Sequence, residues 1–120
     1  MQITDAELDV MRVLWASPGV SAAEVHTALE GQKDWSRQTV KTLLTRLCEK
    51  GAVSTEADGR KFLYTAQISQ DDYETGAAKS FVDKVFSGRA APLVAHLADS
   101  RGLTEDDIAE LESLIERLKS

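Results

Sequence analysis

A change of hydrophobic period constrains the fold of this chain more than any other feature. Up to Gly51, apolar residues recur at helical spacing in three segments, whereas from Val53 to Tyr64 they alternate with polar residues. Alternation predicts strands, and the Asp58-Gly59 pair between the two runs predicts a tight hairpin turn in which both of these residues have positive φ. A hairpin is only marginally stable alone, so it must pack on the helices.

Capping residues indicate where the helices begin. Thr4 and Ser21 each precede a glutamate by three residues, the spacing of a capping box, and they are expected to start two short helices. Ser36 is the expected N-cap of a third helix that runs to Lys50, with Gly51 as its stop. Three further helices are predicted after the hairpin, over residues 69–88, 90–98 and 104–118.

Three helices followed by a hairpin is the order of a winged helix-turn-helix module. The sequence therefore predicts a mainly α fold with a small β-hairpin, in two parts: a winged-helix DNA-binding domain over residues 1–66 and a helical dimerisation region over residues 67–120. In such modules the helix before the hairpin enters the major groove of DNA, and the hairpin, or wing, contacts the flanking backbone.

The third predicted helix has the two faces that this role requires. Wound at 100° per residue, it gathers Val40, Leu44 and Leu47 on one side, and hydroxyls, an amide and cations on the other. Such groups can bond to bases and phosphates. The outward residues are Gln38, Lys41, Thr42, Thr45 and Arg46, and the wing adds Arg60 and Lys61. The alternative is an ordinary amphipathic helix with a solvated polar face.

The net charge of −6 does not exclude a nucleic-acid partner, because the charge is unevenly distributed. Residues 33–61 hold seven basic and four acidic side chains, a balance of +3, whereas residues 67–120 hold six and eleven, a balance of −5. A phosphate backbone responds to the local field within a Debye length of about 8–10 Å. The basic segment is therefore the part of the chain that can approach DNA.

Five segments of the chain resemble the penicillinase repressors and copper-responsive repressors of bacteria. They are ITDAELDVMRVLW (3–15), DWSRQTVKTLLTRLCEKG (34–51), DGRKFLYTA (58–66), SFVDKVFSG (80–88) and the helix at 103–118. The resemblance implies a winged-helix homodimer that sits on palindromic operator DNA and blocks transcription. It places Ser36, Arg37, Gln38, Thr39, Lys41, Thr42, Thr45 and Arg46 on the recognition helix, and Arg60 and Lys61 on the wing.

Apolar residues after position 69 predict a dimer interface. In the last helix they recur at steps of three and four, as in a helix–helix seam. The region holds more apolar surface than about fifty residues can bury alone. The alternative is that this surface packs on the winged helix of the same chain. The predicted interface residues are Phe81, Val85, Phe86, Leu93, Val94, Leu97, Ile108, Leu111, Leu114, Ile115 and Leu118.

The chain departs from both branches of the family that it resembles. The copper branch carries Cys-x-Cys motifs near its C-terminus, whereas Cys48 is the single cysteine here, so no metal site and no cofactor are predicted. The β-lactam branch is inactivated by cleavage of an Asn-Phe bond, and the matching pair here is His96-Leu97. The resemblance leaves open a partnership with a membrane sensor-protease system.

Other classes of function find little support in the sequence. No Ser/His/Asp order, Gly-rich phosphate loop or carboxylate pair indicates an enzyme, and no catalytic residue is predicted. No signal peptide or membrane-length apolar run is present, so a cytoplasmic protein without membrane insertion is expected. The alternative function is a winged-helix protein–protein interaction module without sequence-specific DNA binding.

Overall fold

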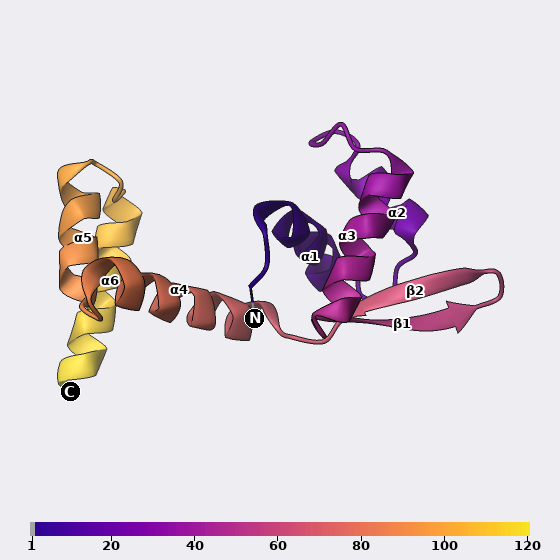
Figure 1. The fold of residues 1–120 in the computed structure, drawn as a ribbon. Helices are drawn as coiled ribbons and strands as arrows, with labels where there is room; N and C mark the ends of the chain where they lie inside the picture. Colours follow the sequence, from indigo (N-terminus) through magenta and orange to yellow (C-terminus); the bar gives the residue numbers. More distant parts are fainter. Residues whose placement is uncertain (1) are drawn as a thin grey trace. The chain divides into compact units, whose positions relative to one another are not determined.

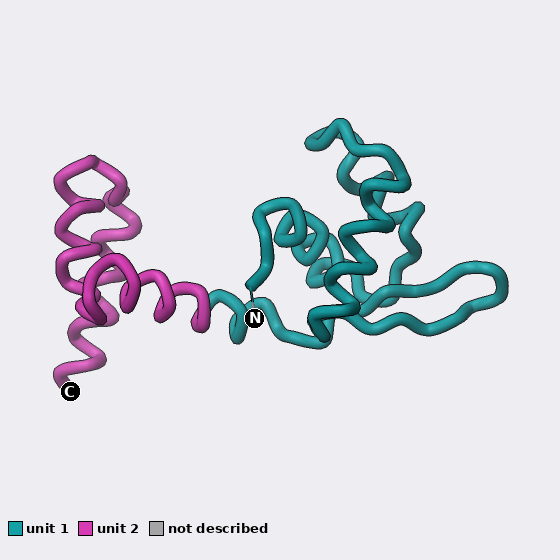
Figure 2. Tube along the Cα trace, viewed as in Figure 1, with its two compact units in different colours: residues 1–74 teal, residues 75–120 magenta. Residues whose placement is uncertain are grey.

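The computed structural model describes residues 2–120, which fall into two compact units divided between Glu74 and Thr75 (Figure 2). The first unit contains α1 (Asp5–Ala16), α2 (Ala22–Leu29), α3 (Arg37–Glu49), β1 (Val53–Asp58) and β2 (Lys61–Ala66), and α4 (Gln70–Phe86) begins in it (Figure 1). The second unit contains the rest of α4, α5 (Ala90–Asp99) and α6 (Glu105–Lys119). The predicted order, three helices, a hairpin and three helices, is confirmed.

The predicted caps form in the structure. The Thr4 hydroxyl accepts a hydrogen bond from the Glu7 N–H at 3.2 Å, and Glu7 Oε1 accepts one from the Thr4 N–H at 2.8 Å. Ser21 and Glu24 make the same reciprocal pair at the start of α2. Each pair satisfies donors that the first turn of a helix leaves free, so these local sequences specify where the helices begin.

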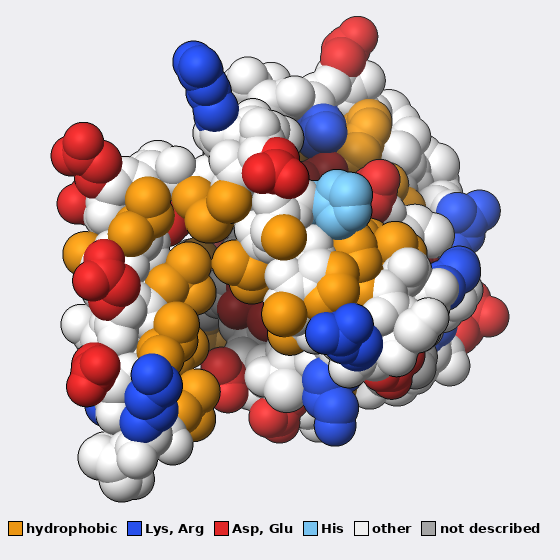
Figure 3. Space-filling view, turned by 90° about the vertical axis from the view of Figure 1, so that its left-hand side faces the viewer, with side chains coloured by type: hydrophobic (Ala, Val, Ile, Leu, Met, Phe, Trp, Pro, Cys, Tyr) orange, Lys and Arg blue, Asp and Glu red, His pale blue; other side chains and the backbone are white. Residues whose placement is uncertain are grey.

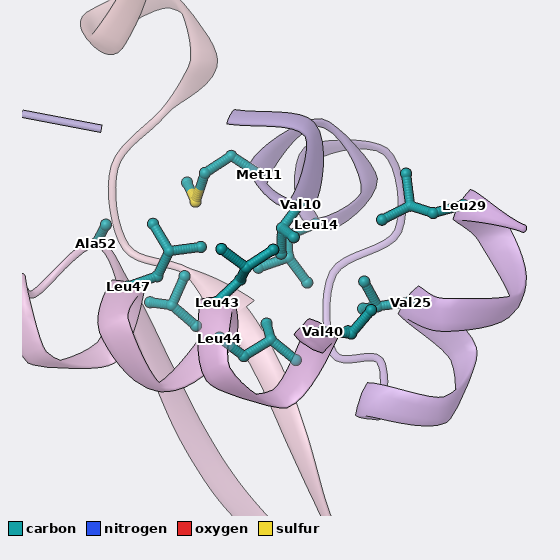
Figure 4. Packing of buried hydrophobic residues seen from close by; sticks show 11 residues of the cluster. Val10, Met11, Leu14, Val25, Leu29, Val40, Leu43, Leu44, Leu47 and Ala52 are labelled. Atoms are coloured by element: carbon teal, nitrogen blue, oxygen red, sulfur yellow. The ribbon is translucent and has the colours of Figure 1, made fainter. Parts of the chain in front are cut away.

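The first unit has one hydrophobic core, which α1, α2, α3 and the start of the hairpin enclose (Figure 4). The apolar stripe of α3 faces the stripe of α1, and Val25 and Leu29 close the core from α2. The polar side of α3 is thereby left outward. The buried residues are Val10, Met11, Leu14, Val25, Leu29, Val40, Leu43, Leu44, Leu47, Ala52 and Val53.

A buried ion pair joins the start of α1 to the end of α3. Glu7 is only 1% exposed, and its Oε1 accepts a hydrogen bond from Lys50 Nζ, which also donates to the carbonyl of Gln2 at 2.8 Å. Burial raises the pKa of Glu7, but the hydrogen bonds from Lys50 and Thr4 and the Lys50 charge outweigh burial, and the net pKa lies below its usual value. The pair therefore holds the last turn of the third helix against the first helix.

The hairpin turn differs from the predicted one by one position. Asp58 pairs with Lys61 in the antiparallel register, so Gly59 and Arg60 are the central residues rather than Asp58 and Gly59. Only Gly59 has positive φ, at 66°, the pattern of a type II′ turn. The prediction that Asp58 and Gly59 both have positive φ is therefore wrong. In this register only the first central residue needs positive φ, and that residue is Gly59. Arg60 consequently lies at the tip of the wing.

The first unit extends beyond the hairpin into α4. Trp15 Nε1 donates a hydrogen bond to the carbonyl of Ile68 at 2.9 Å, and its ring lies 5.9 Å from that of Tyr73. These contacts place the first turn of α4 with the winged helix, and the compact unit ends at Glu74. The Ser69 hydroxyl caps α4 as predicted, accepting from the Asp72 N–H at 3.0 Å.

The second unit has no buried side chain in α5, in α6 or in its part of α4. Its aromatic contacts join Phe81 to Phe86, at 5.9 Å between ring centroids, and Phe86 to His96, at 5.7 Å. Hydrophobic side chains reach the surface over a broad area of the face shown in Figure 3. The exposed large ones in this unit are Phe81, Val85, Val94, Leu97, Ile108, Leu114, Ile115 and Leu118.

Gly76 lies inside α4, and glycine has the lowest helix propensity of all residues except proline. A Cβ built at this position meets no atom within 4 Å, and the glycine does not have positive φ. Gly76→Ala is therefore expected to stabilise α4 by about 0.5–1 kcal/mol, because alanine loses less backbone entropy. A higher thermal midpoint of the full chain would show this, and an unchanged or lower midpoint would contradict it.

Candidate nucleic-acid interface

The start of α3 is braced from two sides. The Ser36 hydroxyl accepts from the Thr39 N–H at 3.1 Å and shares a hydrogen bond with the Thr39 hydroxyl, also at 3.1 Å. From α2, His26 Nε2 lies 2.8 Å from the carbonyl of Trp35, the residue before the cap. With the Nε2 proton in place, His26 donates to this carbonyl and ties the turn between α2 and α3 to the second helix.

The sequence did not predict this role of His26. Its partner is a backbone carbonyl, and no side-chain motif signals such a bond. Trp35 itself packs partly buried against the core, and Lys33 Nζ lies 5.7 Å from the centre of its ring. The turn before α3 is thus held by contacts that do not use the outward face of the helix.

The residues predicted to face DNA on α3 are at the surface. Thr42 is the one that is partly buried, and its hydroxyl donates to the carbonyl of Gln38 at 2.9 Å. This bond uses the only proton of the hydroxyl, which leaves a methyl group and an acceptor lone pair for a ligand. The exposed members are Ser36, Arg37, Gln38, Thr39, Lys41, Thr45 and Arg46.

Cations from α3 and from the wing line one hollow of about 360 Å³. Arg37 and Lys41 come from α3, Arg60 and Lys61 from the hairpin, and the first turn of α2 forms a further wall. Within residues 2–120, none of these four cations forms an ion pair with a carboxylate. The hollow therefore gathers positive charge, and an anion is the ligand that suits it.

The hairpin is placed at this hollow by its contact with the segment before α2. Tyr64 exchanges backbone hydrogen bonds with Val20, at 2.7 and 3.3 Å, and its carbonyl also accepts from Gly19 at 3.1 Å. Since Val20 directly precedes the N-cap Ser21, the wing and the start of α2 are joined. The residues of β2 before Tyr64 continue past the helix start into the open (Figure 1).

The carboxylate of Glu24, in the first turn of α2, is hydrogen-bonded to Ser21, the N-cap of that helix. Hydrogen bonds from the backbone and side chain of Ser21 lower the pKa of Glu24, and the charge of Lys61 adds to this effect. The carboxylate is thus directed to Ser21. Cys48, on the border of the buried face, has a pKa raised by burial, so its thiol favours the neutral form.

The ten predicted DNA-facing residues all lie in the first unit, where four of them line the cationic hollow, and the eleven predicted interface residues all lie in the second unit. Phe62 was not predicted as a site residue, although it also lines the cationic hollow. No helix in residues 2–120 has the length and apolar character needed to cross a bilayer.

Comparison with known proteins agrees with this arrangement. Residues 3–117 match the family described as penicillinase repressor. The penicillinase repressor of Bacillus licheniformis is 34% identical over 119 residues, covering 99% of this chain and 93% of that protein. The methicillin resistance regulatory protein MecI of Staphylococcus aureus strain N315 is 32% identical over 116 residues, covering 97% and 94%.

A solved structure extends the likeness to the site. The solution structure of monomeric Bacillus licheniformis BlaI in complex with the blaP half-operator has 42% sequence identity and a TM-score of 0.53, covering 61% of this chain and 89% of that one. The first unit is accordingly a winged helix-turn-helix of the BlaI type. The chain belongs to the penicillinase repressor family, whose members are repressors rather than enzymes.

Proposed function

We propose that this protein is a homodimeric transcriptional repressor that binds palindromic operator DNA through α3 and the wing. The observation that carries the proposal is the outward face of α3, where an amide, hydroxyls and cations stand beside the unpaired cations of the wing. Base edges in the major groove match such donors and acceptors, and phosphates match the cations. The BlaI relative bound to its half-operator supports the same use of this surface here.

The second unit supports the homodimer. None of its eleven predicted interface residues is buried in the single chain, and Leu118 is 76% exposed. A second copy that covers this surface would supply the missing core by two-fold symmetry, the commonest arrangement of homo-oligomers. A symmetric dimer presents two copies of α3, and a palindrome presents two equivalent half-sites.

A protein–protein interaction module would use the same surfaces, and the salt dependence of binding separates the two functions. DNA binding releases counterions, so its affinity falls steeply as salt rises, with a slope of about 0.9 per phosphate neutralised. A sensor-protease partner stays a prediction: the bond between His96 and Leu97 lies inside α5, so the helix would have to open before cleavage.

Substitutions at two cations should distinguish base contact from phosphate contact. Arg46→Ala is expected to cost about 1–3 kcal/mol on the operator and much less on unrelated duplexes, if its guanidinium bonds to a base. Lys61→Ala should weaken binding to all duplexes alike and lower the salt slope by about one per bound subunit, because each subunit loses one phosphate contact. Fluorescence anisotropy with duplexes from the promoter region of the protein's own gene measures both.

Lys79→Ala is the matched control, since it removes an exposed cation from the second unit, which holds none of the predicted DNA-facing residues. Its affinity and salt slope should equal those of the unmodified protein. The proposed function is contradicted if the unmodified chain prefers no duplex of that region and its binding does not change with salt.

A further inference from the structure

Phe62 is an aromatic side chain for which neither the core nor the family likeness gives a role. It is 55% exposed, although it lies on β2 two residues before the partly buried Tyr64 and on the same face of the hairpin. Alternation predicts this face to be the packed one. Unlike Tyr64, Phe62 is not among the residues that pack against the core of the first unit.

The surroundings of Phe62 indicate what it contacts. The ring lines the same hollow as Arg37, Lys41, Arg60 and Lys61. A single ring among four cations is too small and too charged a surface for a stable protein interface, which needs a contiguous apolar patch. The ligand that suits it is anionic at one point and apolar beside it.

The sugar–phosphate backbone of duplex DNA has this alternation. Each phosphate carries one negative charge, and each deoxyribose between two phosphates presents carbon atoms that an aromatic ring can cover. We infer that the hollow between α2, α3 and β2 holds one phosphate with its neighbouring deoxyribose, the phosphate on the cations and the sugar against Phe62. This inference rests on the proposed function. Phe62 would then be an uncharged residue that contacts the DNA backbone.

The two kinds of contact differ in how they respond to salt. A cation–phosphate contact releases a counterion and contributes to the salt slope, whereas an apolar ring against a sugar releases none. Covering about half of an aromatic ring corresponds to roughly a tenfold change in affinity. Since every deoxyribose offers the same carbon atoms, the contribution of Phe62 should be independent of base sequence.

The experiment measures binding of full-length variants to the operator and to an unrelated duplex over a range of salt concentrations. Phe62→Ala should weaken binding to both duplexes roughly tenfold per bound subunit and leave the salt slope unchanged, whereas Lys61→Ala should lower the slope by about one per bound subunit. Phe62→Leu keeps an apolar side chain and should stay within about threefold of the unmodified protein. Leu63→Ala, on the opposite face of the hairpin, is the matched control and should bind as the unmodified protein does.

Thermal unfolding of each variant tests whether the hairpin and core are retained, and the exposure of Phe62 predicts a midpoint close to that of the unmodified chain. If Phe62→Ala binds within twofold of the unmodified protein while Lys61→Ala binds more weakly, the inference is wrong and the proposed function stands. A reduced salt slope in Phe62→Ala would overturn it as well, since the ring would then act through the cations. If the unmodified protein shows no salt-dependent duplex binding, the proposed function itself fails.

Discussion

A fragment ending at Glu74 is expected to be monomeric and to bind a full palindromic operator at least about a hundredfold more weakly than the whole chain. It keeps the core and the contacts of Trp15 with Ile68 and Tyr73, so the winged helix should remain folded. It loses the second unit, and with it the gain in overall affinity of about 10²–10⁴-fold that comes from linking two binding modules. Analytical ultracentrifugation and anisotropy with full and half operators measure the two effects.

A substitution in the full chain tests the same point without truncation. Ile115→Glu places a charge in the proposed seam of α6, at a side chain that is about half exposed in the single chain, and should lower both dimerisation and operator affinity. Ser113→Glu adds the same charge on the other side of the helix and serves as control. A full-length chain that is monomeric at micromolar concentration and still binds the full operator tightly would refute the dimer.

Lys50→Met is expected to destabilise the first unit by about 2–3 kcal/mol. The substitution keeps the aliphatic part of the side chain and removes the charge that bonds to Glu7 Oε1, leaving a carboxylate that is 1% exposed. Breaking a buried pair by removing one partner costs about 3–5 kcal/mol, and the Lys50 side chain is one-third exposed, which reduces this cost. Urea unfolding followed by circular dichroism gives the change in free energy.

The loss of unfolding free energy caused by Lys50→Met should depend on pH in a definite direction. The pKa of Glu7 is lower in the folded protein than in the unfolded chain, so its stabilisation is complete above the unfolded pKa of about 4.3 and is lost as the pH falls through the folded value. The destabilisation by Lys50→Met should therefore shrink below about pH 4. Arg12→Met, which removes an exposed ion pair with Asp9, is the control and should cost under about 1 kcal/mol. A difference for Lys50→Met that is constant from pH 7 to pH 3 would rule out the ion pair as its source.

Most of the fold could be predicted because its signals are local. The caps at Thr4, Ser21 and Thr104 each place a hydroxyl and a carboxylate three residues apart, and all three form. The stripe of α3 follows from helical spacing alone. The predicted hairpin turn was off by one position. A turn centred on Asp58-Gly59 and one centred on Gly59-Arg60 both place a glycine where positive φ is needed, and only the register between the strands selects the second.

What could not be predicted depends on residues far apart in the chain. Glu7 meets Lys50 across 43 positions, and Trp15 meets Ile68 across 53. Neither pair has a motif, and the second moves the unit boundary into α4. The exposure of Phe62 could not be predicted for a different reason: the alternation that it shares with Tyr64 places both on one face of the hairpin, and the structure packs only Tyr64 against the core.

The helices of the second unit have no buried side chain there, which bears on the lifetime of the proposed dimer. If its helices obtain their core from a second copy, the unit is folded only while the subunits are associated, and dilution shifts it toward open, cleavable chains. Degradation would then accelerate as the concentration falls, because proteases act on the open population. A modest drop in synthesis would thus cause a larger drop in operator occupancy. Repression would then depend more steeply on the rate of synthesis, without any ligand.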